Sequence, residues 1–182
     1  MQYLLFFAGT LLLAFLSRHC LRDIRSHGFY RFLAWECMLV LLLHNAPFWF
    51  QHRFAWYQLL SWLLLFLSLP PVVGGFILLK QHGASDALRN DPALLGFEKT
   101  AQLVTHGIYR HIRHPLYGSL LLLAWGLYFK QPSWWPGFAL ACGATATLAL
   151  TALAEERENR IYFGQAYVDY MQRSWRFIPG VF

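Results

Sequence analysis

The sequence predicts an all-α, polytopic membrane protein with five transmembrane helices and a C-terminal amphipathic helix. Of its 182 residues, 57% are hydrophobic and only 13% are charged, which is about half the charged share of a typical soluble domain. The mean hydropathy is +0.37, and the charged residues lie in short clusters between long apolar runs. Because this number of charged residues is too small to cover a surface that faces water, lipid is the expected solvent.

Five apolar runs are candidates for crossing a bilayer, which takes about 20 residues per helix. They comprise residues 1–17, 32–50, 54–79, 115–129 and 131–154. The first run lacks the basic start and the cleavage site of a secretory signal, so we expect it to be retained as a span. The last two runs are joined at residues 130–133, which predict a tight helical hairpin.

Two of these runs contain residues that interrupt their apolar character. Pro70 and Pro71 lie within the third run and are expected to kink it. Glu36 is the only formal charge in the second run. Acids inside a membrane are often functional, but Glu36 lies only five residues from Arg31 and could instead reach the interface. The role of Glu36 is left open.

The basic residues predict the orientation of the protein. Arg53 and Lys130 lie in the two loops on one side, and the other thirteen Lys and Arg residues lie on the opposite side. These thirteen are Arg18, Arg22, Arg25, Arg31, Lys80, Arg89, Lys99, Arg110, Arg113, Arg157, Arg160, Arg173 and Arg176. Because positive charge stays inside, the long loop and the C-terminus are expected to face the cytoplasm.

The same charge pattern predicts the location and the partners of the protein. We expect one domain over residues 1–182, integral to a membrane such as the bacterial inner membrane, with its catalytic half at about 80–182. Basic clusters between apolar runs favour membrane lipids over nucleic acid as partners. The oligomeric state is left open.

The densest group of polar residues lies within 103–118, immediately before the fourth run. Pro115 suits the first turn of a helix, and Gly107 allows a turn that most residues resist. A helix that begins here would offer free N–H groups and partial positive charge to a carboxylate or a phosphate. His106, His111 and His114 lack a matched acidic partner nearby, so no metal site is predicted. The alternative is a helix start with interfacial side chains.

A second polar group follows the fifth run. Glu155, Glu158 and Asn159 would share one face of a helix. Aromatic and apolar residues then recur at helical spacing, at Phe163, Tyr167, Tyr170 and Met171. They predict an amphipathic helix that lies on the membrane or folds back over the first group. The alternative is a solvated cap.

These two groups together resemble the isoprenylcysteine carboxyl methyltransferase family and, more distantly, the phospholipid N-methyltransferases. The resemblance rests on residues 105–109 and 113–117, and on Glu155-Glu156 with the later Phe163-Gly164 and residues 176–180. It covers about residues 102–180. It implies an integral membrane enzyme that takes a methyl group from S-adenosylmethionine (SAM), with the cofactor in a pocket that faces the cytoplasm.

The resemblance also implies site residues when it is carried over by position. The implied cofactor contacts are Gln102, Leu103, Val104, Tyr109, His114, Pro115, Leu116, Tyr117 and Glu155. The candidate catalytic residues are Arg110, which could face an acceptor carboxylate, and His111 or Glu156, which could act as a base. A carboxylate acceptor is already ionised at neutral pH, whereas an amine acceptor needs a base.

The methyl acceptor is expected to be lipophilic. Family members that methylate prenylcysteine carry an arginine four residues before the position of Glu155, where this chain has Thr151. The carboxylate of an isoprenylcysteine-like compound is therefore one expectation, and the amine of a phospholipid or a small lipid is the alternative. A sterol-type reductase, which would bind a nicotinamide cofactor, and a non-enzymatic membrane protein are two further alternatives.

Overall fold

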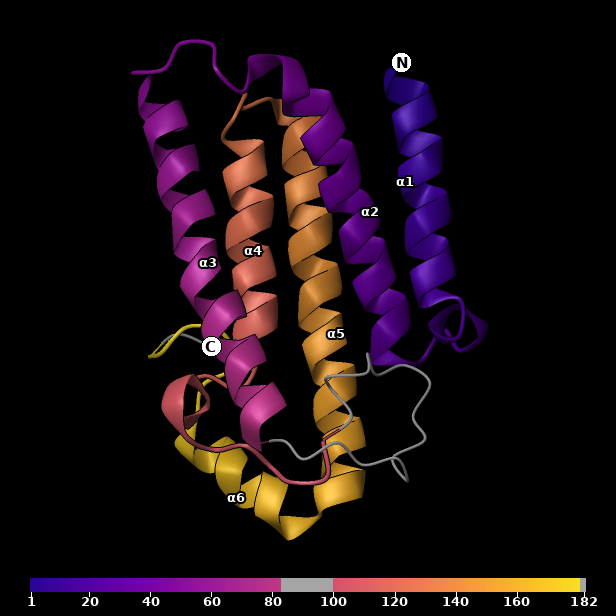
Figure 1. The fold of residues 1–182 in the computed structure, drawn as a ribbon, viewed down its shortest axis with the longest axis vertical. Coiled ribbons are helices and arrows are strands. Elements are labelled where there is room, and N and C mark those ends of the chain that lie inside the picture. Colours follow the sequence, from indigo (N-terminus) through magenta and orange to yellow (C-terminus); the bar gives the residue numbers. More distant parts are fainter. Residues whose placement is uncertain (83–99, 181–182) are drawn as a thin grey trace.

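The computed structural model describes residues 1–82 and 100–180, and these residues form a bundle of helices (Figure 1). Five helices run side by side, and a sixth, α6 (Gln165–Arg173), lies across one end of the bundle. The five are α1 (Gln2–Ser17), α2 (His27–Asn45), α3 (Trp56–His82), α4 (Pro115–Tyr128) and α5 (Ala139–Phe163). Within the described residues, the pairing of Ile112 with Trp175 is an isolated β-bridge.

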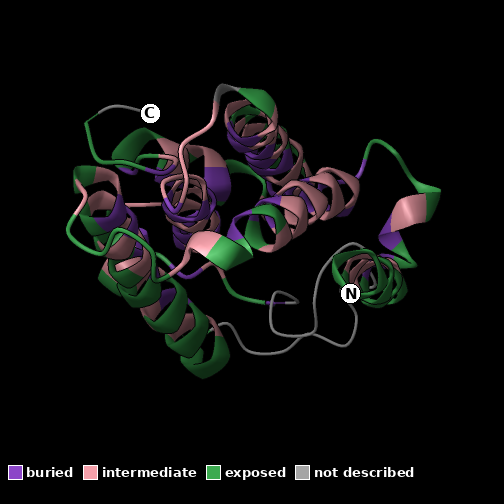
Figure 2. Ribbon diagram, turned by 90° about the horizontal axis from the view of Figure 1, so that it is seen from above, coloured by how far each residue is buried: buried purple, intermediate pink, exposed green. Residues whose placement is uncertain are grey.

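The centre of the bundle is formed by α4 and α5. Helix α3 packs along α4, α2 packs along α5, and α1 lies at the edge against α2. Small and aliphatic residues such as Ala34, Leu41, Ala144 and Leu148 are fully buried between α2 and α5. The outward faces of α1 and α3 are exposed and apolar (Figure 2), which is the surface expected of helices that meet lipid.

The all-α prediction is confirmed over the described residues. Helix α3 and the helical stretch Trp135–Phe163 are long and apolar enough to cross a bilayer. Helices α1 and α4 have only 16 and 14 residues, and at about 1.5 Å per residue both are shorter than the hydrocarbon core. Two helices therefore meet the requirements for a membrane span, and the predicted total of five stays a prediction.

Helices α2 and α5 extend beyond the apolar runs that predicted them. Ser26 caps α2 by accepting a hydrogen bond from the main-chain nitrogen of Phe29 at 3.3 Å, so α2 begins at His27 and includes polar residues. Helix α5 continues through the charged residues that follow its apolar part. The short connection between α4 and α5 agrees with the predicted hairpin. Helix α3 continues through Pro70 and Pro71.

Glu36 faces the edge helix of the bundle. The hydroxyl of Thr10 in α1 donates a hydrogen bond of 2.9 Å to its carboxylate. This hydrogen bond therefore joins α1 to α2.

The polar segments meet at one end of the bundle. Helices α1, α3 and α5 end there, and α2 and α4 begin there. Eleven of the thirteen basic residues predicted for the cytoplasmic side lie in or next to the helix termini at this end of the bundle, while Arg89 and Lys99 lie outside the described residues. Arg53 and Lys130 are at the opposite end. The two groups of polar residues singled out in the sequence are thus brought together.

Candidate active site

A cavity lies at the polar end of the bundle, where the end of α3, the start of α4, the end of α5 and α6 meet. It is partly open to solvent, and its empty space of about 620 Å³ includes that open part. The lining combines aliphatic and tyrosine side chains with a carboxylate, an imidazole and a guanidinium.

The wall formed by residues 103–114 depends on one turn. Gly107 has a φ of +60°, a conformation that glycine adopts without strain, and a Cβ there would lie 2.6 Å from a methyl carbon of Leu78. The 3₁₀ helix η4 (Gly107–Arg110) follows and buries Tyr109. The Tyr109 hydroxyl donates to the main-chain oxygen of Gly75 in α3 at 3.4 Å, which anchors the turn to the bundle.

The segment after α6 holds the start of α4 in place. The main-chain nitrogens of Arg113 and His114 donate to the carbonyl oxygens of Trp175 and Arg176 at 2.7 and 3.1 Å, and Trp175 donates back to His111 at 2.8 Å. Pro115 then begins α4, and the N–H groups of its first turn have no acceptor within the helix. Leu116 and Tyr117 of this turn line the cavity.

His114 lies between two carboxylates of α5. Its Nδ1 is 3.6 Å from Oε2 of Glu155, and its Nε2 is 3.4 Å from Oε1 of Glu156. Burial disfavours the charged imidazole, but the two carboxylates outweigh burial and raise the pKa of His114 above its usual value. Asn159 also donates to Glu155 at 3.4 Å. The carboxylate of Glu155 is therefore held by His114 at the start of α4 and by Asn159 on α5.

Glu156 faces away from the cavity into a network of ion pairs. It accepts from Nε of Arg113 at 3.1 Å and from Nε and Nη2 of Arg176 at 3.0 and 2.9 Å. Arg113 also donates to the main-chain oxygens of Met171 and Ser174. This network fastens the segment after α6 to the start of α4 and to α5, and its member Arg113 also lines the cavity.

Helix α6 folds back over the first polar group and forms one side of the cavity. The Tyr170 hydroxyl donates to the main-chain oxygen of Tyr109 at 2.6 Å. Tyr167 is only 3% exposed. Burial raises the pKa of both phenols, so they remain neutral. The predicted amphipathic helix is confirmed, and of its two predicted positions it takes the one over the site.

Eight of the nine predicted cofactor contacts line this cavity. They are Leu103, Val104, Tyr109, His114, Pro115, Leu116, Tyr117 and Glu155. The ninth, Gln102, is exposed and does not belong to the described lining. Their role in binding a cofactor is not tested by this geometry and stays a prediction.

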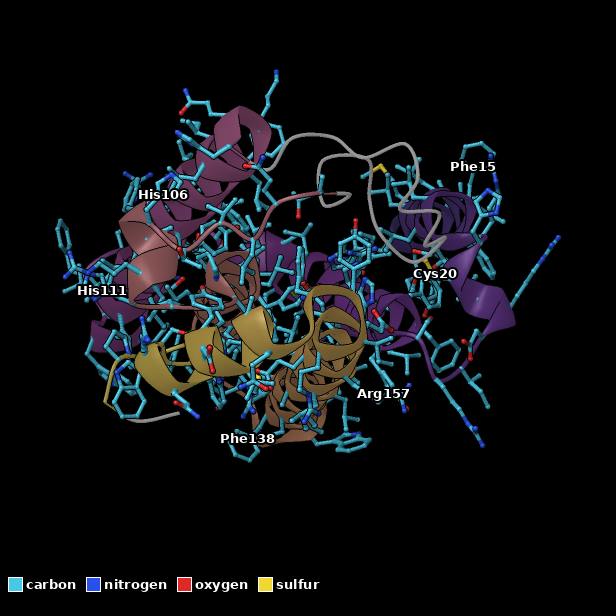
Figure 3. All side chains as sticks on the ribbon, turned by 90° about the horizontal axis from the view of Figure 1, so that it is seen from below. Phe15, Cys20, His106, His111, Phe138 and Arg157 are labelled. Carbon is cyan, nitrogen blue, oxygen red and sulfur yellow. The ribbon has the colours of Figure 1, made fainter. Side chains whose placement is uncertain are left out.

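The three candidate catalytic residues lie elsewhere. Arg110 and His111 are exposed, and His111 lies at the edge of the molecule when the polar end is viewed face on (Figure 3). Neither is among the described residues that line the cavity, and Glu156 is occupied by its arginine partners. Catalytic roles for all three stay predictions.

Seven further residues line the cavity that the sequence did not identify as contacts. They are Leu79, Thr100, Arg113, Asn159, Phe163, Tyr167 and Tyr170. The helical spacing of the last three aromatic residues was a signal, because it predicts that they share a face. No comparable signal marks Leu79 or Thr100, since only the fold brings them to the site.

The fold and the cavity together define a small helical membrane protein with a polar site at one end of its bundle. A sequence model of the phospholipid methyltransferases matches residues 72–166, just over half of the chain. The chain therefore belongs to the phospholipid methyltransferase family of membrane methyltransferases. The resemblance predicted from the two polar groups is confirmed at this level.

Two curated relatives from rice are similar over part of their length. They are probable protein-S-isoprenylcysteine O-methyltransferases from Oryza sativa subsp. indica and subsp. japonica, each 29% identical over 93 residues. The match covers 46% of this chain and 44% of each relative, so less than half of each rice protein is represented. No solved structure matches the chain.

Proposed function

We propose that this protein transfers a methyl group from SAM to a lipophilic acceptor at the cytoplasmic face of its membrane. The observation that carries the proposal is the convergence on one cavity of eight residues that the resemblance marks as cofactor contacts. SAM, when bound, would supply a methyl group on a positively charged sulfur. Family membership and the names of the rice relatives support the same type of reaction.

The residues of the cavity fit the chemistry of SAM. The free N–H groups at the start of α4 suit its carboxylate. Glu155 suits its amino group or its ribose hydroxyls, and the rings of Tyr109 and Tyr117 with Val104 suit its adenine. The chain would bind and orient the cofactor and exclude water from it, which are the main contributions required for a direct displacement.

The first candidate acceptor is the carboxylate of an isoprenylcysteine-like compound, and the second is a lipid amine. One observation favours the amine. Thr151 is fully buried and its hydroxyl donates to the main-chain oxygen of Thr147 at 2.8 Å, so this position offers no cation to an acceptor carboxylate. The family model matched is that of phospholipid methyltransferases.

Binding of SAM to the purified protein in detergent tests the cofactor. We expect saturable binding that Glu155→Gln and His114→Ala each weaken by about tenfold or more, because the first removes a charge-assisted contact with the cofactor and the second removes the imidazole that holds Glu155. Arg157→Gln is the matched control, since Arg157 is exposed on the same helix. Saturable binding of a nicotinamide cofactor in place of SAM would contradict the proposal, as would full binding by both variants.

Incubation of membranes with methyl-labelled SAM identifies the acceptor. A labelled product in the organic phase that is released by mild base would be an ester and would indicate a carboxylate acceptor. A base-stable labelled product would indicate an amine. Absence of label from the organic phase, with saturable SAM binding, would contradict a lipophilic acceptor.

A further inference from the structure

His27 forms a contact between α2 and α5 that the two sequence motifs do not include. It is the first residue of α2 and is wholly buried. Its Nδ1 contacts Oε2 of Glu158, and its main-chain nitrogen donates to Oε1 of the same carboxylate at 3.3 Å. Both oxygens of Glu158 are therefore held at the N-terminus of α2, where the helix dipole also favours a negative charge.

Glu158 links this contact to the proposed cofactor site. It lies three residues after Glu155 on α5, and residues at this spacing are neighbours on one helix face. Glu155 lines the cavity and meets His114 on its other side. Glu155 is thus next to Glu158 on α5, and Glu158 in turn contacts His27 on α2.

The charge of His27 acts on Glu155. Burial disfavours the imidazolium, but the hydrogen bond that it donates to Glu158 and the charges of Glu155 and Glu158 raise the pKa of His27, against a smaller opposing effect of Arg31. Burial raises the pKa of Glu155, but the hydrogen bond and the charge of His114 lower it, and the charge of His27 adds to them. A charged imidazole has two N–H donors. Nε2 of His27 is buried and has no hydrogen-bond partner within residues 1–82 and 100–180.

We propose that His27 is a positioning residue of the methyltransferase site: latched by Glu158, it adds a second positive charge near Glu155, besides that of His114, and helps to keep that carboxylate in place for the cavity. The inference rests on the proposed function, because it takes Glu155 as a cofactor contact. It extends the site to α2, which lies outside the residues 72–166 that the family model matches.

The test separates charge from packing. His27→Asn keeps a small neutral donor near Glu158 but removes the imidazolium. We expect the KM and the Kd for SAM to rise about fivefold to tenfold, since one favourable charge is lost beside Glu155, while kcat changes less than twofold. Glu158→Gln, which releases the latch, should give a similar rise. The double variant should be no worse than either single variant, because both remove one interaction.

The controls decide between failure of this inference and failure of the proposed function. Arg157→Gln should leave the KM and the Kd unchanged. If the wild-type protein binds SAM, Glu155→Gln weakens binding and neither His27→Asn nor Glu158→Gln does, His27 is only a packing contact and the inference is overturned. Loss of thermal stability with unchanged SAM affinity has the same meaning. If the wild-type protein shows no saturable SAM binding, both proposals are overturned.

Discussion

Glu155 and Glu156 are neighbours in the chain, but their side chains have different surroundings. Glu155 lines the cavity beside the imidazole of His114 and the amide of Asn159. Glu156 is 2% exposed and binds two guanidinium groups. One acid is therefore available to a ligand, and the other serves to join α4, α5 and the segment after α6.

This difference predicts that replacing each glutamate by glutamine has a different main effect. Glu156→Gln leaves the guanidinium groups of Arg113 and Arg176 without their shared counter-charge, and breaking a buried ion pair costs about 3–5 kcal/mol. We expect a large fall in the thermal unfolding temperature in detergent. Glu155→Gln should lower it much less and should chiefly weaken SAM binding. A Glu156→Gln protein of normal stability with lost turnover would favour the catalytic role that the sequence suggested.

The sequence identified the residues of the site better than their directions. Residues 114–117 lie at the start of a helix, which Pro115 predicts, and the resemblance assigns them to the same site as Glu155. Residues 102–113 form an irregular segment with a 3₁₀ turn, where no simple period applies. Tyr109 turns inward and Arg110 and His111 turn outward, a choice made by the contacts of Tyr109 with Gly75 and Tyr170.

At the scale of elements, the contact between α3 and α4 depends on small residues. A Cβ on Gly75 would lie 3.2 Å from Cγ of Pro115 and 3.3 Å from a methyl carbon of Leu116. Further along the same pair, the Ser61 hydroxyl donates to the main-chain oxygen of Gly126 at 2.7 Å. Small and hydroxyl residues allow close approach of membrane helices, and here they bring α3 to the cavity.

Gly74 and Gly75 provide a matched pair of substitutions. Gly75→Leu would force α3 away from the start of α4, and overpacking of this kind costs about 1–3 kcal/mol. We expect a lower unfolding temperature and weaker SAM binding, because Pro115, Leu116 and Tyr109 form the cavity wall. Gly74→Leu changes helix propensity equally, but a Cβ at Gly74 meets no atom within 4 Å, so both quantities should stay near those of the wild type. Equal effects at the two positions would contradict this packing argument.

The bounds of the elements show why apolar length is an incomplete guide to helix length. The second apolar run begins at residue 32, but the Ser26 cap starts α2 at His27. The fifth run ends at residue 154, but α5 continues to Phe163, because the intervening charged residues favour helix as much as apolar ones do. The added turns carry His27, Glu155 and Glu158. These ionisable residues of the proposed site therefore lie in helical segments that hydropathy alone does not predict.

At the scale of the whole molecule, the two ends of the bundle have different characters. One end gathers most basic residues and the cavity, whereas the other end is closed by an aromatic cluster around Lys130. Lys130 is fully buried, with Nζ 3.5 Å from the ring centroid of Trp62 and 3.3 Å from Oε1 of Gln58. Gln58 donates in turn to the main-chain oxygens of Phe48 and Lys130. This cluster ties the connections of α2 with α3 and of α4 with α5 to each other.

Burial lowers the pKa of Lys130 from 10.5 to about 8, and this predicts how stability depends on pH. Between these two values the unfolded chain binds more protons than the folded chain at this site, so the contribution of Lys130 to stability rises as the pH rises. We expect the wild-type unfolding temperature in detergent to gain about 3 °C between pH 8 and pH 9.5 relative to Lys130→Met, which lacks the titrating group.

The comparison isolates Lys130 because the other groups that titrate in this range are common to both proteins. Lys80→Met is the control, since Lys80 is exposed at the end of α3, and its unfolding temperature should follow that of the wild type across the range. The opposite slope, with the wild type losing stability relative to Lys130→Met as the pH rises, would mean that the cluster of Trp49, Trp62 and Gln58 stabilises the ammonium ion more than water does. In that case the far end of the bundle would be held by the charge of Lys130, and not by the packing of its side chain.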